Sequence, residues 1–171
     1  TSDMERAREV GIGHVEELEF TEGVRAGKKE DKMGWRASDT RELIMEEAFV
    51  PAENRLGNEG EGFSNFMQTL DAGRIGIAAL AVGLAQGAYG AARRYAFERK
   101  QFGQPIGSFQ AVSHKLVDMK LRLDTARCML YRLGWLMSRG KATPLDSALV
   151  KLHLSESLVS TSLDAIQVHG G

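Results

Sequence analysis

The sequence is poor in cysteine, in proline and in net charge. Cys128 is the single cysteine among 171 residues, so no disulfide can form within the chain, which favours a reducing compartment. A formal net charge of −1 gives no electrostatic basis for binding nucleic acid or an anionic membrane. The first twenty residues are acidic and lack an apolar core, so no secretory signal is expected there. The sequence does not begin with methionine, which leaves two alternatives: a leader has been removed, or further residues precede this segment.

The remaining composition is that of a folded protein. Hydrophobic residues make up 43% of the chain, which is enough to bury a core. The length fits one domain, or one domain with part of another. His169 has no partner at a spacing typical of a metal site or a catalytic triad, so we assign it no chemistry and expect no metal.

A long run without charge lies between Arg74 and Arg93. It contains eighteen residues, which would span about 27 Å as a helix, just short of a bilayer core. Four glycines, one glutamine and many alanines make it only moderately hydrophobic. Small residues let neighbouring helices approach closely, so the run predicts the central helix of a bundle rather than a membrane span.

Periodicity and helix breakers predict three long helices. Residues 62–100 form one helix, or two joined near Gly73. Pro105 and its flanking glycines end it, and Ser108 is expected to cap the next helix. That helix ends at Gly140, and its apolar stripe of about 3.5-residue period comprises Leu116, Met119, Leu123, Ala126, Leu130, Leu133 and Met137.

The third helix has the strongest start signal. Thr143 is expected to cap it, with Pro144 at its first position and Asp146 in its first turn. We predict that its inward face comprises Leu145, Leu149, Leu152, Val159, Leu163 and Ile166. Three amphipathic helices form an incomplete antiparallel bundle, so a fourth helix or another chain should cover the remaining apolar surface.

The first part of the chain differs from the rest. Residues 43–51 predict a strand ended by Pro51, and residues 28–41 are rich in turns. Residues 1–22 carry seven acidic and two basic side chains and match no structural pattern. The predicted fold is therefore mostly α, with residues 1–58 a short remnant of a β domain and residues 59–171 the incomplete helical bundle.

Several short motifs are spread along the chain from Met33 to the last residue. In chain order they are Met33-Gly34-Trp-Arg36-Ala-Ser38-Asp39-Thr40, Val50-Pro51-Ala-Glu-Asn54-Arg-Leu56-Gly57, Gly60-x-Gly62-Phe63, Leu70-Asp71-x-x-Arg74, Arg99-Lys-Gln-Phe102-Gly103, Gln110-Ala-Val and Gln167-Val-His-Gly170-Gly171. Together they resemble the motifs of the acyl-CoA dehydrogenases, most closely those of the short-chain branch. The resemblance implies an FAD-dependent enzyme that oxidises an acyl-CoA and passes electrons to an electron-transfer flavoprotein. It also implies a homo-oligomer built as a dimer of dimers, in the bacterial cytoplasm, which is slightly favoured, or in the mitochondrial matrix.

The resemblance implies three groups of FAD-binding residues. Arg99, Gln101 and Phe102 match positions that contact the pyrophosphate and adenine side, commonly across a subunit interface. Phe109 and Gln110 match positions that line the cofactor, and Gln167, Gly170 and Gly171 match a loop near its adenosine half. Each set also has a structural alternative: a solvated arginine at a helix end, a core phenylalanine with a first-turn glutamine, and an ordinary glycine helix stop.

The resemblance places Asp71 and Arg74 at the acyl-CoA site. The alternative is an i,i+3 ion pair on a helix, and the two roles are compatible. The family's catalytic glutamate usually lies in a Glu-Gly-Thr segment that would follow Gly171, and in a smaller branch it precedes the helix arginine, where this sequence has Gly73. No catalytic residue is therefore assigned, and we expect the chain alone to be inactive. A non-catalytic helical domain for oligomerisation or interaction is the alternative function.

Overall fold

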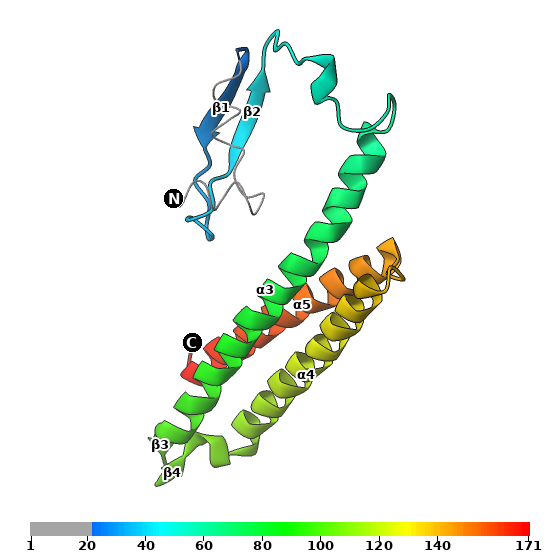
Figure 1. The fold of residues 1–171 in the computed structure, drawn as a ribbon. Helices are drawn as coiled ribbons and strands as arrows, with labels where there is room; N and C mark the ends of the chain where they lie inside the picture. Colours follow the sequence, from blue (N-terminus) through cyan, green and yellow to red (C-terminus); the bar gives the residue numbers. More distant parts are fainter. Residues whose placement is uncertain (1–21) are drawn as a thin grey trace, which may run out of the picture. The chain divides into compact units, whose positions relative to one another are not determined.

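The computed structural model describes residues 22–171, which divide into two compact units. The first unit ends at Asn58 and the second runs from Glu59 to Gly171. Three helices account for most of the described residues, with two small antiparallel sheets (Figure 1). The mostly helical fold class is thereby confirmed. The acidic segment 1–22, which matched no structural pattern, lies outside the described part of the chain except for Glu22.

The first unit contains a β-hairpin. Strands β1 (Val24–Lys29) and β2 (Arg41–Met45) pair antiparallel, and a short 3-10 helix, η1 (Ala52–Asn54), follows. The predicted strand over residues 43–51 was placed too late, because β2 ends at Met45. Glu47 has a φ of 52°, a left-handed conformation that stops an extended strand before the proline is reached.

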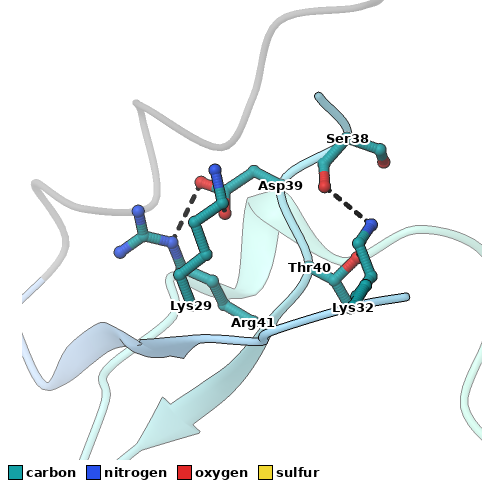
Figure 2. A network of polar contacts seen from close by, with 6 residues as sticks. All are labelled: Lys29, Lys32, Ser38, Asp39, Thr40 and Arg41. Carbon is teal, nitrogen blue, oxygen red and sulfur yellow. Dashed lines mark hydrogen bonds and ion pairs between the residues drawn. The ribbon is translucent and has the colours of Figure 1, made fainter. Parts of the chain in front are cut away.

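The loop between β1 and β2 is held by side chains. The Lys32 ammonium donates to the carbonyl of Ser38 at 2.7 Å and to the hydroxyl of Thr40 at 2.8 Å (Figure 2). Nearby, the Arg41 guanidinium donates to the Asp39 carboxylate at 2.9 Å. The Ser-Asp-Thr motif therefore fixes the base of this loop.

The second unit begins with one unbroken helix, α3 (Gly62–Glu98), which continues through Gly73. Strands β3 (Lys100–Gln101) and β4 (Gln104–Pro105) form a tight hairpin, and the 3-10 helix η2 (Ile106–Ser108) leads into α4 (Gln110–Ser138). The predicted Ser108 cap was wrong. Phe109 occupies the cap position without a side-chain hydrogen bond, because Ser108 already belongs to η2.

Helix α5 (Pro144–His169) has the expected start. Thr143 and Asp146 form a capping box in which the Asp146 amide donates to the threonine hydroxyl at 3.2 Å and the Thr143 amide donates to the carboxylate at 3.1 Å. Hydrogen bonds from Thr143 lower the pKa of Asp146, with the Arg132 guanidinium adding to the effect. The capping pattern in the sequence is confirmed.

The bundle core consists largely of small side chains on α3. One cluster packs alanines of α3 against Leu123 and Leu133 of α4 and Leu154 of α5. A second cluster at the other end packs Ala92 and Ala96 of α3 against Met119 of α4 and Ala165 and Val168 of α5. The predicted stripe of α4 is mostly confirmed, although Leu130 is only partly buried and Met137 is exposed.

The predicted inward face of α5 was wrong. All six of its residues are exposed by 51% to 66%: Leu145, Leu149, Leu152, Val159, Leu163 and Ile166. The buried face instead comprises Ser147, Val150, Leu154, Ser157, Thr161, Ala165 and Val168. The alanine-rich surface of α3 permits a close approach, so the contact face of α5 is occupied by smaller residues. We call the six exposed residues the α5 apolar face.

Helix α3 meets the length and composition criteria for crossing a membrane. The mean hydropathy of its most apolar 18-residue window is 1.5, and 28% of that window is buried in the structure. The core helix of a soluble protein meets the same criteria, so this is weak evidence for a membrane span.

Asp164 gives the bundle a predictable pH dependence. Its carboxylate accepts from Arg122 at 2.6 Å and Lys115 at 3.2 Å, joining α5 to α4. Partial burial raises the pKa of Asp164, but the two hydrogen bonds outweigh this and lower it below the usual value. The folded chain therefore takes up this proton at lower pH than the unfolded chain. The contribution to stability is full above the unfolded pKa and is lost as the pH falls through the folded pKa.

We expect Asp164→Asn to lower the free energy of unfolding by about 1–3 kcal/mol at neutral pH, since it removes a charged hydrogen-bond acceptor. The difference from the unsubstituted chain should shrink as the pH falls below the ordinary aspartate pKa of about 3.9. Urea unfolding across this pH range, at one protein concentration, measures it. Asp118→Asn, at an exposed position of α4 without an ion pair among residues 22–171, is the matched control. A difference that does not change with pH would contradict the argument.

Candidate functional site

The residues that follow α3 form a strained, exposed turn. Phe102 and Gly103 connect β3 to β4, and both have positive φ, 51° and 80°. This combination is what a two-residue hairpin of the type I′ class demands, and it is costly for phenylalanine. Phe102 is 91% exposed, and its ring meets the Phe109 ring edge-on at a centroid distance of 6.1 Å.

Arg99 lies between the helix and this turn. Its amide donates to the carbonyl of Tyr95 at 2.8 Å, and its carbonyl accepts from the amide of Ile106 at 2.9 Å. The backbone is therefore fixed on both sides, while the side chain is exposed. Within residues 22–171 the Arg99 guanidinium has no hydrogen bond or ion pair, so it does not satisfy the last carbonyls of α3.

The start of α4 lies against the same turn. Gly107 sits so close to α3 that an added Cβ would be 3.1 Å from the carbonyl oxygen of Ala96. This close contact fixes Phe109, which is half-buried, and Gln110, which is exposed in the first turn of α4. We call residues 99–110 the hairpin corner; they bring together all five FAD-binding candidates of this part of the sequence.

The C-terminal end of α5 reaches the same end of the bundle. Gly170 has a φ of 94°, which lets the chain leave the helix, and Gly171 follows it. The His169 ring stacks on the Tyr95 ring at a centroid distance of 4.5 Å, and its Nδ1 lies 2.7 Å from the carbonyl oxygen of Ala165. Gln167 is exposed.

A shallow groove runs between α3 and α5 next to this end. It has a volume of about 560 Å³ and is lined by Ala88 and Ala91 from α3, Ser162, Ala165 and Ile166 from α5, and the three terminal residues His169, Gly170 and Gly171. Its walls are mostly small apolar side chains and backbone. Such a surface allows a flat ring to lie against the helices.

The other candidate pair lies far from the hairpin corner. Asp71 and Arg74 form an ion pair on the first half of α3, with side chains 25% and 32% exposed. The twenty-five helical steps from Arg74 to Arg99 correspond to about 37 Å. The structure thus gathers Arg99, Phe102, Gln110 and the terminal glycines at one end and keeps the acidic–basic pair apart from them.

The residues at the bundle end suit the adenosine diphosphate half of FAD. A guanidinium without a protein partner can pair two pyrophosphate oxygens. The exposed side chains of Gln101, Phe102 and Gln110 belong to the same hairpin corner, and the space around Gly103 is open, because a Cβ added there would meet no atom within 4 Å. Residues 22–171 contain no cluster of three or more potential metal ligands.

Two features of this site were not predicted from the sequence. Residues 103–107 were interpreted only as a helix break, because a Phe-Gly pair is not a typical hairpin signal. The contact between Tyr95 and His169 joins two helices that are distant in sequence, so the sequence alone does not indicate it. The sequence offered two local signals for the residues involved. Tyr95 is an aromatic residue one turn before Arg99, and His169 directly precedes the glycines.

Comparison with known proteins agrees with this fold. The family model described as acyl-CoA dehydrogenase, C-terminal domain, matches residues 60–171. A caffeyl-CoA reductase–Etf complex subunit of Acetobacterium woodii is 44% identical over 151 residues, covering 88% of this chain and 40% of that protein. The chain spans about 40% of the length of the curated relatives it matches.

Two solved structures show the same arrangement. The butyryl-CoA dehydrogenase of Megasphaera elsdenii superposes with a TM-score of 0.86 at 44% identity, over 89% of this chain and 40% of that one. PigA in complex with FAD and proline superposes with a TM-score of 0.85 at 37% identity, over 89% of this chain and 40% of that one.

Proposed function

Because this chain belongs to the acyl-CoA dehydrogenase family, we propose that it forms part of an FAD-dependent enzyme of the short-chain type. This enzyme oxidises an acyl-CoA thioester to the 2,3-enoyl-CoA and passes the electrons to an electron-transfer flavoprotein. The chain contributes the helical domain that binds the adenosine diphosphate half of the cofactor. Its location is the bacterial cytoplasm or the mitochondrial matrix.

One observation carries this proposal. The exposed Arg99 guanidinium, the strained Phe102 turn and the terminal glycines meet at one end of the bundle, although seventy residues of sequence separate them. A helix stop or a surface arginine alone would not require this convergence. The solved relative that binds FAD has the same fold at 37% identity.

The residues divide the binding of FAD among them. Arg99 pairs the pyrophosphate oxygens, Gln101 and Gln110 donate amide hydrogens, and the Phe102 and Phe109 rings exclude water from one side. Gln167, Gly170 and Gly171 border the adenosine half, where the absence of a Cβ permits close approach. FAD, when bound, supplies the electron acceptor for the oxidation of the acyl chain.

The two ends of α3 serve different molecules. Arg74 lies about 37 Å along the helix from Arg99 and Asp71 lies further still, so the pair and the hairpin corner of one chain act on different ligands or on different copies of the complex. This separation supports an oligomer in which Arg99 reaches the cofactor held by a neighbouring subunit. The Asp71–Arg74 pair then contacts the acyl-CoA of its own subunit.

The α5 apolar face supports the second candidate function, a non-catalytic helical domain that assembles with other chains. Six large apolar side chains on one helix are exposed in the isolated chain. Patches of this kind mark interaction surfaces. Both candidate functions use the α5 apolar face for assembly. They differ in that only the enzyme is expected to contain flavin.

We expect the isolated chain to self-associate or aggregate, because burial of the α5 apolar face removes apolar surface from water. Light scattering at tens of micromolar protein measures this. The double variant Leu149→Glu, Leu163→Glu should shift the chain toward monomer. Lys151→Glu, at an exposed polar position of the same helix, is the control. A stable monomer of the unsubstituted chain would contradict the expectation.

A chimera tests the proposed function. The segment of the Megasphaera elsdenii butyryl-CoA dehydrogenase that matches this chain is replaced by the corresponding residues of this chain, and we call the product the carrier enzyme. The proposed function predicts a yellow protein that retains FAD through gel filtration and reduces a dye with butyryl-CoA. A folded, oligomeric carrier enzyme without flavin would favour the interaction domain instead.

A further inference from the structure

Two aromatic side chains that the proposed function leaves without a role connect the two halves of the site. Tyr95 lies one turn before Arg99, and its carbonyl accepts the Arg99 amide at 2.8 Å. His169 directly precedes the terminal glycines. Their rings stack at 4.5 Å with an angle of 26° between the planes. This stack joins the last turn of α3 to the last turn of α5.

We propose that the Tyr95–His169 stack is a positioning pair that sets Gly170 and Gly171 at a fixed place relative to Arg99. The proposal rests on the proposed function, because its purpose is to let both helix ends hold the same adenosine diphosphate group. Neither ring is assigned a contact with the cofactor. Each acts through the backbone beside it, Tyr95 on the Arg99 turn and His169 on the glycines.

The glycines need such an anchor. Glycine loses more conformational freedom on ordering than any other residue. Gly170 and Gly171 are held only by backbone hydrogen bonds, at 3.1 Å to Gln167 and 3.2 Å to Ile166, among the described residues. Both amides already donate to these carbonyls, so a ligand would approach the glycines by packing against their backbone, and this packing needs the glycines to be ordered. An anchor on the preceding residue reduces that cost before the ligand arrives.

The histidine is oriented from its own helix. Its Nδ1 lies 2.7 Å from the Ala165 carbonyl oxygen, so Nδ1 carries the hydrogen and donates it. This hydrogen bond fixes the ring plane, and Tyr95 meets that plane from the other helix. A phenylalanine at position 169 would keep the stack without the hydrogen bond, whereas a leucine would lose both.

A purely structural role is distinguishable, because the core beneath the stack does not depend on it. Ala92 and Ala96 are fully buried, and Ala165 and Val168 are 8% and 5% exposed beside them. These residues hold α3 and α5 together at this end. Loss of the stack should therefore loosen the glycines while the bundle stays folded.

The first measurement uses the 171-residue chain and needs no cofactor. Hydrogen exchange followed by mass spectrometry compares peptides that contain Gly170 and Gly171 in the unsubstituted chain, Tyr95→Leu, His169→Leu and His169→Phe. We expect the two leucine variants to exchange faster in these peptides and not in peptides from the α4 core. His169→Phe should restore slow exchange. Equal exchange in all four proteins would overturn the proposal.

The second measurement uses the carrier enzyme. Equilibrium titration of the apoprotein with FAD should give a dissociation constant about tenfold higher for Tyr95→Leu and His169→Leu, which corresponds to about 1.4 kcal/mol. His169→Phe and Tyr95→Phe should remain close to the unsubstituted protein, with melting temperatures alike in all five. The phenylalanine variants keep the stack, so they separate positioning from general destabilisation.

The outcomes separate the two proposals. If Arg99→Ala weakens FAD binding and the leucine variants do not, the positioning pair is overturned and the proposed function stands. If none of these substitutions changes FAD binding, the hairpin corner is not the FAD site and the positioning pair is overturned; the proposed function fails only if the unsubstituted carrier enzyme holds no FAD. If His169→Leu and His169→Phe weaken binding equally, stacking is irrelevant and the positioning role is overturned. A leucine variant that fails to fold assigns the stack a structural role and overturns the proposal.

Discussion

Replacing Arg99 by alanine in the carrier enzyme is expected to raise the dissociation constant of FAD by about 10- to 100-fold. A hydrogen bond to a charged group is worth about 1.5–3 kcal/mol, and every 1.4 kcal/mol is a factor of ten. Arg99 has an exposed guanidinium without a partner in the described part of the chain, so its loss costs the fold little. The flavin-to-protein absorbance ratio after gel filtration measures the effect.

Arg93→Ala is the matched control for this substitution. Arg93 is an exposed arginine on the same helix, and its guanidinium lies over the Phe97 ring, 5.8 Å from the centroid. It should leave flavin content unchanged. If Arg99→Ala also leaves the ratio unchanged and only lowers the melting temperature slightly, Arg99 is a helix-end arginine and must be removed from the site.

The second large expected effect is the absence of turnover by the 171-residue chain alone. Removal of the α-proton of an acyl-CoA needs a carboxylate within hydrogen-bond reach of that proton. Gly73 supplies none at the position before Arg74, and Glu59 lies outside any helix, in the glycine-rich segment before α3. The nearby Asp71 carboxylate forms an ion pair with Arg74 on the same helix.

A dye-reduction assay with butyryl-CoA and added FAD tests this expectation on the isolated chain. The free-flavin blank is the control, and the carrier enzyme is the positive control. Turnover by the isolated chain above the blank would reveal a base that the sequence and structure do not identify. Asp71→Asn would then be the first variant to examine, because Asp71 is the carboxylate closest in sequence to Arg74.

Helix positions were predictable because their signals are local. The Thr143–Asp146 capping box and the stripe of Leu116, Met119 and Leu123 depend on residues within a few positions of one another. The unbroken course of α3 through Gly73 was one of two alternatives that the sequence left open. Packing against the neighbouring helices keeps α3 continuous, because a single glycine destabilises a helix by only about 1 kcal/mol.

The orientation of α5 was not predictable from its own residues. Its leucines recur with a helical period, but so do its serines, threonine and alanine on the other face. The alanine surface of α3 selects the face with small side chains, and this preference comes from a helix that is distant in sequence. The site was likewise only partly predictable. The family resemblance identified Arg99 and Gly170 as candidates, whereas the Tyr95–His169 contact depends on tertiary structure and could not be predicted.

Because α3 is uninterrupted, the number of residues between Arg74 and Arg99 determines the distance between the Asp71–Arg74 pair and the hairpin corner. Each inserted or deleted residue between Arg74 and Arg99 would move one end by about 1.5 Å and rotate it by about 100° around the helix axis. A single insertion between Arg74 and the buried Ala92 would turn the Asp71–Arg74 pair relative to Arg99 while leaving every local motif intact. This stretch of the chain should therefore tolerate exchange of residues far better than any change in their number.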